Sequence, residues 1–285
     1  MAKTLDTWLG RSTQELLAAG ITTARLDALV LLCDEVGRDK AWVLAHPEYE
    51  LQESDLKKLS TKIVQRKQHI PLAYIRGIAE FYGREFYVNR HVLIPRPESE
   101  SIIEQLLIFA SPLSTPDIID VGSGSGALAI TAKLEYPGAR VFATDIDGEC
   151  LKIARQNAKT LQAIIDFRQG DLLEPLRQDP VPKSTAIILA NLPYVPADYP
   201  INAAARHEPQ LALFSGSDGL DHYRRLFAAQ DFPAPRTMII TEALPFQHQP
   251  LARIAHDAGF RTAAVQGLVQ VFRRTVGASP GETHI

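Results

Sequence analysis

Strand-like and helix-like segments alternate from Asp117 onward, and this alternation limits the possible folds more than any other feature of the chain. A short apolar run, such as Asp117–Val121 (DIIDV), is followed by a helical stretch, such as Gly126–Gly138 (GALAITAKLEYPG), and the order repeats. Such alternation predicts an α/β fold, with an open, mostly parallel sheet between helices on both faces. The final two apolar runs flank Gly267 and predict a hairpin that supplies an antiparallel edge to the sheet.

The chain before this region has a different pattern. Apolar residues recur at helical spacing over Thr23–Gly37, with Gly37 as the predicted end of the helix. One face of this predicted helix consists of Leu26, Leu29, Val30 and Cys33. Short aromatic and β-branched runs on both sides of Gly83 predict a β-hairpin. We therefore expect a helical domain over residues 1–74, a β-hairpin linker over residues 75–98 and the α/β domain over residues 99–285.

The composition argues against several classes of protein. No apolar run approaches the roughly 20 residues of a membrane-spanning helix, and the N-terminal sequence MAKTLDTWLG lacks the apolar core of a signal peptide. Cys33 and Cys150 stand far apart without His or Cys neighbours, which argues against a metal site or a disulfide. The net charge of -3 is not the basic footprint of most nucleic-acid binders. We therefore expect a monomeric cytoplasmic protein without a membrane segment, a metal or direct nucleic-acid contact.

A glycine-rich turn lies between the first predicted strand of the sheet and the helix that follows it. The turn consists of Gly122, Ser123, Gly124, Ser125 and Gly126. Glycines allow a ligand to approach the backbone closely, and the free N–H groups of the next helix favour an anion. Asp145 ends the next strand. Its separation along the sequence from the glycine turn is about that at which a carboxylate accepts hydrogen bonds from ribose hydroxyls in nucleotide-binding folds. Asp171 follows the third strand along the same edge, so the sequence predicts a nucleotide-like ligand there.

Three other interpretations of these residues stay open at this point. Gly122, Gly124 and Ala127 also satisfy the G-x-G-x-x-G/A pattern of NAD-binding proteins. A glycine-rich turn can also connect a strand to a helix without binding any ligand. Asp171 also fits the N-cap of a short helix over Leu172–Leu176 (LLEPL).

Four residues follow the fourth predicted strand, Thr185–Ala190, and are expected to face the same crevice as the glycine turn. They are Asn191, Leu192, Pro193 and Tyr194. The Asn191 side-chain oxygen and the backbone carbonyls beside the proline are fixed acceptors for both hydrogens of a planar –NH2 group, which Tyr194 can cover. This pattern is typical of a site for an amide or an exocyclic amine.

Three motifs in this order, DVGSGSG, ATD and NLPY, resemble those of class I S-adenosylmethionine-dependent methyltransferases that act on a planar nitrogen. The similarity extends to PLAYIRGIAEFYGREFYV, VLIPRPESE and RHEPQLALFSGSDGLDHYRRL, and over roughly residues 10–260 the chain resembles the PrmC/HemK family. The resemblance implies a Rossmann-like catalytic domain, preceded by a helical substrate-recognition domain and a β-hairpin linker. It also implies an enzyme that methylates the side-chain amide nitrogen of the GGQ glutamine in class 1 peptide chain release factors. The methyl donor would be S-adenosyl-L-methionine, and the product S-adenosyl-L-homocysteine.

The resemblance also implies roles for individual residues. Gly122–Gly126 would wrap the methionine end of the cofactor, and Asp145 would bind its ribose. Asp171 and Leu172 would contact its adenine. Asn191–Tyr194 would hold the glutamine amide for direct in-line transfer of the methyl group, with no covalent intermediate and no assigned general base.

Two positions depart from the usual family pattern. Leu192 stands where the motif has proline, although the same NLPY string occurs in ribosomal RNA adenine dimethyltransferases. Leu172 stands where some members have a tryptophan, so apolar contact would replace stacking on the adenine. Asn191 belongs to both halves of the expected site, because it would border the cofactor as well as the glutamine.

Other functions stay open from the sequence alone. A ribosomal-protein glutamine methyltransferase would use the same residues, and an RNA or DNA adenine methyltransferase would grip an amino group in the same way. A non-catalytic nucleotide-binding module or an NAD oxidoreductase would keep the glycine turn without methyl transfer. His207 and Glu208 fit a structural loop better than catalysis, whereas Arg96 and Glu98 fit a helix start as well as a substrate entrance.

Overall fold

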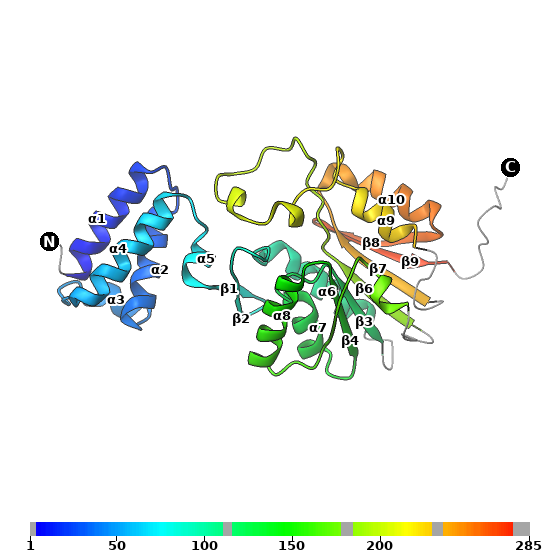
Figure 1. The fold of residues 1–285 in the computed structure, drawn as a ribbon, viewed down its shortest axis with the longest axis horizontal. Helices are drawn as coiled ribbons and strands as arrows, with labels where there is room; N and C mark the ends of the chain where they lie inside the picture. The colour runs from blue at the N-terminus through cyan, green and yellow to red at the C-terminus, as the bar shows by residue number, and fades with distance from the viewer. Residues whose placement is uncertain (1–3, 111–115, 178–184, 230–235, 276–285) are drawn as a thin grey trace. The chain divides into compact units, whose positions relative to one another are not determined.

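The structure is a computed structural model that describes residues 4–110, 116–177, 185–229 and 236–275. The chain divides into two compact units. The first consists of residues 1–78 with 201–207, and the second of residues 79–200 with 208–285. The first unit has one apolar core and the second has two apolar clusters, and the helices and strands that supply them are labelled in Figure 1.

The first unit is a bundle of helices around one apolar core. Its elements are α1 (Leu5–Ala18), α2 (Ala24–Val36), α3 (Lys40–Ala45), α4 (Glu53–Lys67), α5 (Leu72–Arg76) and the 3-10 turn η3 (Ala205–His207). The helix predicted over Thr23–Gly37 is present as α2, and Gly37 ends it in the left-handed conformation. The predicted face of this helix is only partly right: Leu29 is buried, but Leu26 is half exposed, and Leu31 and Leu32 outside that face are fully buried.

The buried face of α2 differs from the predicted face because this helix packs against both α1 and α4. Two neighbours require a broad buried surface, so a single stripe of apolar residues does not describe it. Asp27 lies on the buried side and accepts a hydrogen bond from Arg66 Nε of α4 at 2.7 Å. The ion pair permits burial of a carboxylate that an apolar pattern places on the outside.

The predicted β-hairpin is present as β1 (Ile78–Phe81) and β2 (Arg84–Tyr87), which form a two-stranded sheet. Tyr82 and Gly83 form its turn, and both have positive φ, as the two-residue type I′ connection requires. Phe81 and Phe86 are buried in the core of the second unit. The hairpin is therefore anchored to that core by one aromatic side chain from each strand.

A seven-stranded sheet forms the centre of the second unit. Its strands are β3 (Asp117–Val121), β4 (Arg140–Asp145), β5 (Asp166–Gln169), β6 (Thr185–Ala190), β7 (Arg236–Glu242), β8 (Phe260–Gln266) and β9 (Val269–Arg274). Their order is β5-β4-β3-β6-β7-β9-β8, and the pairs from β5 to β7 are all parallel. The α/β fold with a mostly parallel sheet is therefore confirmed.

The terminal hairpin is present, but its place in the sheet differs from the prediction. Strands β8 and β9 pair about Gly267, which has a φ of +57°. It is β9 that pairs antiparallel with β7, and β8 then pairs with the outer side of β9. The antiparallel strand thus lies one position inside the sheet, and β8 forms the edge. A hairpin pattern does not specify which of its two strands joins the sheet.

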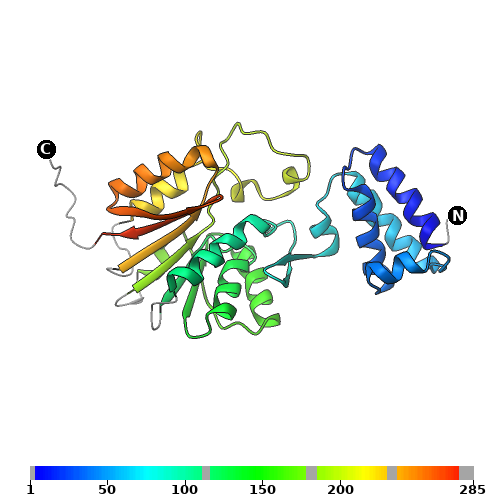
Figure 2. The ribbon, with the colours of Figure 1, turned by 180° about the vertical axis from the view of Figure 1, so that it is seen from behind.

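Helices cover both faces of this sheet (Figures 1 and 2). One face carries α6 (Glu100–Ala110), α7 (Ala127–Glu135) and α8 (Gly148–Thr160), and the other carries α9 (Asp221–Phe227) and α10 (His248–Asp257). The described part of the unit also contains the 3-10 turns η1 (Pro97–Ser99), η2 (Glu174–Leu176), η4 (Gln210–Ala212) and η5 (Pro245–Gln247). Burial on both faces explains why the central strands are nearly continuous apolar runs. Within the described ranges, no helix is long and apolar enough to cross a membrane.

Candidate active site

The sheet order brings the predicted functional residues to one edge. The carboxyl ends of β4, β3, β6 and β7 are consecutive neighbours there. Asp145 ends β4, the glycine turn follows β3, and Asn191 follows β6. The chain places β4 and β5 on one side of β3 and then returns to place β6 and β7 on the other, so the carboxyl edge between β3 and β6 is the switch point where such sheets bind ligands. The predicted residues after β3, β4 and β6 are therefore brought together.

The glycine turn has the backbone conformation that only glycine adopts easily. Gly122, Gly124 and Gly126 have φ values of +73°, +56° and +81°. A Cβ on Gly126 would lie 3.1 Å from the Ala154 Cβ, so this glycine allows α7 and α8 to pack closely. A Cβ on Gly124 would meet no atom within 4 Å, so the turn is open to solvent or a ligand at that position.

The Asp145 carboxylate braces this turn. One oxygen accepts a hydrogen bond from the Gly124 N–H at 2.8 Å, and the other accepts one from the Asp147 N–H at 2.9 Å. Burial raises the pKa of Asp145, and these two N–H groups oppose that shift. Because each carboxylate oxygen has a second lone pair, both oxygens can accept a further hydrogen bond from a ligand.

Two buried polar side chains, those of Asp120 and Asn157, hold the glycine turn in place through hydrogen bonds. Asp120 Oδ2 accepts hydrogen bonds from the Ser123 hydroxyl at 2.7 Å and the Ala129 N–H at 3.2 Å. Its Oδ1 is buried without a hydrogen-bond partner in the described ranges, and burial raises the pKa of Asp120 to about 7. Asn157 of α8 donates to the Ser125 carbonyl at 2.9 Å. The turn is thus fixed by side chains on both of its sides.

Asp171 and Leu172 lie beyond the end of β5. The Asp171 carboxylate forms an ion pair with Arg225. Its backbone carbonyl, not its side chain, accepts the Glu174 N–H at 2.9 Å, so Asp171 is not a side-chain N-cap of η2. Leu172 has a φ of +47°, and its carbonyl accepts a hydrogen bond from the Thr144 hydroxyl at 2.7 Å.

Asn191 and Leu192 follow β6 next to the glycine turn. The Asn191 Nδ2 donates to the Ser99 hydroxyl oxygen at 2.8 Å, which leaves Oδ1 as the acceptor that this amide can offer to a ligand. The Leu192 side chain is buried, and a Cβ on Gly122 would lie 3.1 Å from its Cδ2. Leu192 therefore packs under the turn, so only its backbone is suited to contact a ligand.

Tyr223 is a buried residue of α9 whose hydroxyl reaches the ends of β6 and β7. The Glu242 N–H donates to the Tyr223 hydroxyl oxygen at 3.3 Å, and burial raises the pKa of Tyr223. The same hydroxyl donates to the carbonyls of Ala190 at 2.9 Å and Glu242 at 2.6 Å. Tyr223 therefore holds the ends of β6 and β7 together.

Tyr194 is held at both ends. Its hydroxyl donates to Glu242 Oε1 at 2.8 Å, and its carbonyl accepts a hydrogen bond from Gln247 Nε2 at 2.7 Å. Gly219 has a φ of +80°, and a Cβ there would lie 2.1 Å from the Tyr194 carbonyl oxygen. The next residue, Val195, bonds through its N–H and carbonyl to Leu213 and Ser215. The NLPY segment is therefore fixed by the chain that follows it.

The remaining polar residues singled out in the sequence have structural partners. Glu208 is buried, pairs with Arg96 and accepts the Ile94 N–H at 3.1 Å. A ring nitrogen of His207 lies 3.0 Å from the carbonyl oxygen of Gln68, within the first unit. These contacts fit the loop role that the sequence favoured for His207 and Glu208.

The sequence analysis missed several residues that shape this edge. They are Ser99, Asp120, Asn157, Tyr223 and Glu242. Ser99 and Tyr223 lie inside the motif strings VLIPRPESE and DHYRRL, but nothing local marks them as partners of Asn191 or Glu242. A signal existed for Glu242, since a carboxylate at the end of an otherwise apolar strand is unusual.

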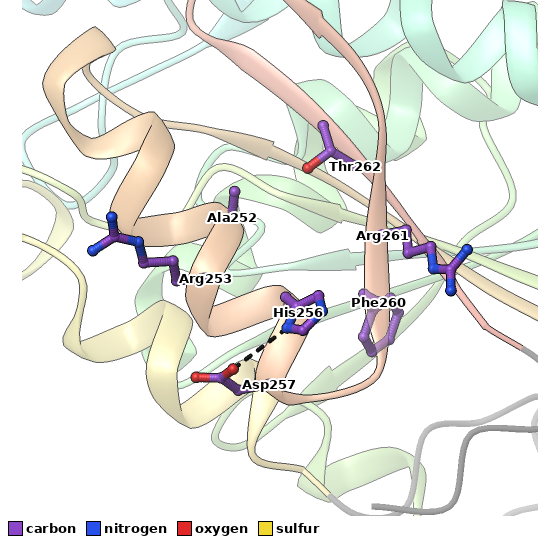
Figure 3. Close-up of a pocket in the computed structure, with 7 residues that line it drawn as sticks. All are labelled: Ala252, Arg253, His256, Asp257, Phe260, Arg261 and Thr262. Carbon is purple, nitrogen blue, oxygen red and sulfur yellow. Dashed lines mark ion pairs between the residues drawn. The ribbon is translucent and has the colours of Figure 1, made fainter. Parts of the chain in front are cut away.

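A surface pocket lies elsewhere, between α10 and the start of β8 (Figure 3). Its lining includes Arg253, His256 and Asp257, and the last two form an ion pair at 3.5 Å. The C-terminus of α10 and the start of β8 lie at the amino ends of the parallel strands, opposite the glycine turn. None of the motif residues lines this pocket.

Comparisons with known proteins agree with this geometry. Residues 7–77 match the model of the PrmC N-terminal domain, and residues 104–205 match the model of the methyltransferase small domain. A release factor glutamine methyltransferase of Moorella thermoacetica is 37% identical over 261 residues, covering 90% of this chain and 91% of that protein. One from Xylella fastidiosa is 35% identical over 272 residues, covering 93% and 97%. One from Koribacter versatilis is 38% identical over 229 residues, covering 78% and 80%.

The parallel sheet, its inserted antiparallel strand and the glycine turn at its carboxyl edge define a class I methyltransferase. Within that class, the similarity along nearly the whole chain is specific. The chain belongs to the release factor glutamine methyltransferase family.

Proposed function

We propose that this protein transfers a methyl group from S-adenosyl-L-methionine to the side-chain amide nitrogen of the GGQ glutamine in class 1 peptide chain release factors. The observation that carries the proposal is the orientation of Asn191. Its Nδ2 is engaged by Ser99, so Oδ1 is the free acceptor, one strand away from the glycine turn. Together with the family membership, this acceptor suits a substrate that brings two N–H hydrogens.

The residues of the edge fit the cofactor. The turn leaves open space at Gly124 that a Cβ would fill, as a ligand lying on the backbone requires. Asp145 offers a buried carboxylate with acceptor capacity left on both oxygens, which suits the two ribose hydroxyls. We assign Gly122–Gly126 to the methionine end, and Asp171 with Leu172 to the adenine. When bound, S-adenosyl-L-methionine supplies a methyl group activated by its attachment to a positive sulfur.

The chain's own residues would act by orientation. An amide nitrogen is a weak nucleophile, because its lone pair is delocalised into the carbonyl group. Asn191 Oδ1 and a backbone carbonyl at Leu192 or Pro193 would accept both amide hydrogens and direct the nitrogen toward the methyl group. These acceptors also stabilise the positive charge that develops on nitrogen during attack. Tyr194, fixed through its hydroxyl, would cover the amide plane and exclude water.

Leucine at position 192 is compatible with this role. Its side chain is buried next to Gly122, so it does not occupy the space where a ligand would lie. The backbone carbonyls therefore keep the function that they would have beside a proline.

We further propose that helices of residues 1–74 recognise the release factor, that residues 75–98 act as a linker and that residues 99–285 form the catalytic domain. The enzyme would act as a cytoplasmic monomer on protein, without direct contact to nucleic acid.

A labelling experiment tests the proposed function. The purified protein is incubated with methyl-labelled S-adenosyl-L-methionine and a class 1 release factor, which carries either its GGQ glutamine or an alanine there. We expect label on the release factor only when the glutamine is present. Label on a ribosomal protein or on RNA, with none on the release factor, would contradict the proposed substrate and keep methyl transfer.

A further inference from the structure

Glu242 is a buried carboxylate at the end of β7 to which the sequence assigned no role. The residue is 1% exposed. Its Oε1 accepts the Tyr194 hydroxyl at 2.8 Å, whereas its Oε2 is buried with no hydrogen-bond partner in the described part of the chain. Burial raises the pKa of Glu242, and the hydroxyl groups of Ser99 and Tyr194 lower it. Ser99 is thus the second hydroxyl close to this carboxylate.

Ser99 connects Glu242 to Asn191. The Ser99 side chain is buried, and its oxygen accepts the hydrogen bond from Asn191 Nδ2 at 2.8 Å. That bond uses a lone pair of the hydroxyl and leaves its single proton to be donated elsewhere. The Oε2 atom of Glu242 is a buried acceptor that lacks a donor. Donation of that proton to Oε2 would satisfy both groups.

An ionised carboxylate can only accept hydrogen bonds. It therefore fixes which group donates and which accepts in each hydrogen bond of the series Glu242, Ser99 and Asn191, and we call this order the direction of the series. Tyr194 and Ser99 must both turn their protons toward Glu242. Ser99 then presents only its lone pairs to Asn191, and the Asn191 amide must face it with Nδ2 rather than with Oδ1. A neutral amide in place of the carboxylate would remove this direction, because it can donate as well as accept.

We propose that Glu242 is a positioning residue that fixes the amide orientation of Asn191 through Ser99 and the ring of Tyr194 directly. This inference rests on the proposed function, because it names what makes the site accept hydrogens from its substrate. The series commits the site to an –NH2 substrate that donates two hydrogens. It disfavours a ligand that would offer an acceptor to Asn191.

The test combines Glu242→Gln with Asn191→Ala. The glutamine keeps the size of the side chain, but it can donate as well as accept hydrogen bonds. We expect Glu242→Gln to lower kcat for release factor methylation about tenfold, with unchanged affinity for S-adenosyl-L-methionine. In the Asn191→Ala background the same change should cost less than threefold, because the effect that runs through Ser99 and Asn191 is already lost and only the effect on Tyr194 remains. The matched charge control is Glu135→Gln. Glu135 lies on α7 and its carboxylate pairs with Arg84, so this variant also replaces a paired carboxylate and should match the wild type.

Two results would overturn the inference: an unchanged kcat for Glu242→Gln, or an equal loss in both backgrounds, which marks a general structural effect. Where Glu242→Gln fails to fold, Ser99→Ala takes its place with the same expected loss and the same dependence on Asn191. An unchanged kcat for Ser99→Ala would equally overturn it. A wild-type protein that does not methylate the release factor contradicts the proposed function instead, and that result is visible before any variant is made.

Discussion

The two halves of the carboxyl edge are built in different ways. The half around the glycine turn is held by contacts that are close in sequence: Asp145 lies 21 residues from Gly124, and Asp120 lies 3 residues from Ser123. The half around Asn191 depends on distant partners. Ser99 lies 92 residues before Asn191, and Glu242 lies 48 residues after Tyr194.

This difference separates two kinds of function. A nucleotide is bound largely by backbone groups, which a short glycine-rich segment supplies by itself. Orientation of a substrate amide needs rigid side chains, and these are fixed by neighbours from several strands. We therefore expect changes at Asn191 to affect turnover and changes at Asp145 to affect cofactor binding.

The largest effect is expected for Asn191→Ala. By analogy with an oxyanion-hole donor, loss of one positioned acceptor removes about 3 kcal/mol of transition-state stabilisation, which lowers turnover about 100-fold. Single-turnover methylation of the release factor at saturating cofactor measures this, and cofactor affinity serves as the control. Turnover close to that of the wild type would remove Asn191 from the mechanism.

The matching change in the other half is Asp145→Ala. A hydrogen bond to a charged group contributes about 1.5–3 kcal/mol, so affinity for S-adenosyl-L-methionine should fall roughly 10- to 100-fold. Titration calorimetry gives the affinity, and turnover at saturating cofactor should stay within a few-fold of the wild type. Unchanged affinity would show that the ribose does not lie against Asp145.

Sequence and structure can now be compared for the same two halves. The alternation of apolar runs correctly predicted the parallel sheet, and it placed Asp145 and Asn191 at the ends of their strands. It did not reveal Glu242 as a partner, because strand order is decided by packing across the whole sheet. For the same reason the predicted face of α2 was only partly right, since burial of Leu31 depends on two neighbouring helices.

Gly219→Ala tests how the Asn191 half is held, with Gly267→Ala as the matched control. Both glycines have positive φ, but only at Gly219 would a Cβ clash, 2.1 Å from the Tyr194 carbonyl oxygen. Left-handed strain costs either variant about 1–2 kcal/mol, and overpacking adds about 1–3 kcal/mol at Gly219. Denaturant unfolding measures the difference. Equal stabilities would mean that Gly219 does not determine the position of Tyr194.

The last prediction concerns Asp120, which supports the glycine turn. Its folded pKa of about 7 is raised above an unfolded value of about 3.9, so the folded state binds the extra proton between these values. Its contribution to stability is therefore complete below pH 4 and is lost as pH rises to 7. Asp120→Asn should flatten this fall, whose slope is at most about 1.4 kcal/mol per pH unit. Parallel slopes in unfolding experiments at pH 5, 6 and 7 would contradict the assignment.

The central claim is that one edge of the sheet holds the cofactor in one half and a substrate amide in the other. A crystal structure with S-adenosyl-L-homocysteine and glutamine tests it most directly. We predict ribose hydroxyls against the Asp145 carboxylate and the glutamine –NH2 group against Asn191 Oδ1, with Nδ2 still on Ser99. Ligands bound elsewhere, or an Asn191 amide that turns Nδ2 toward the glutamine, would contradict the account.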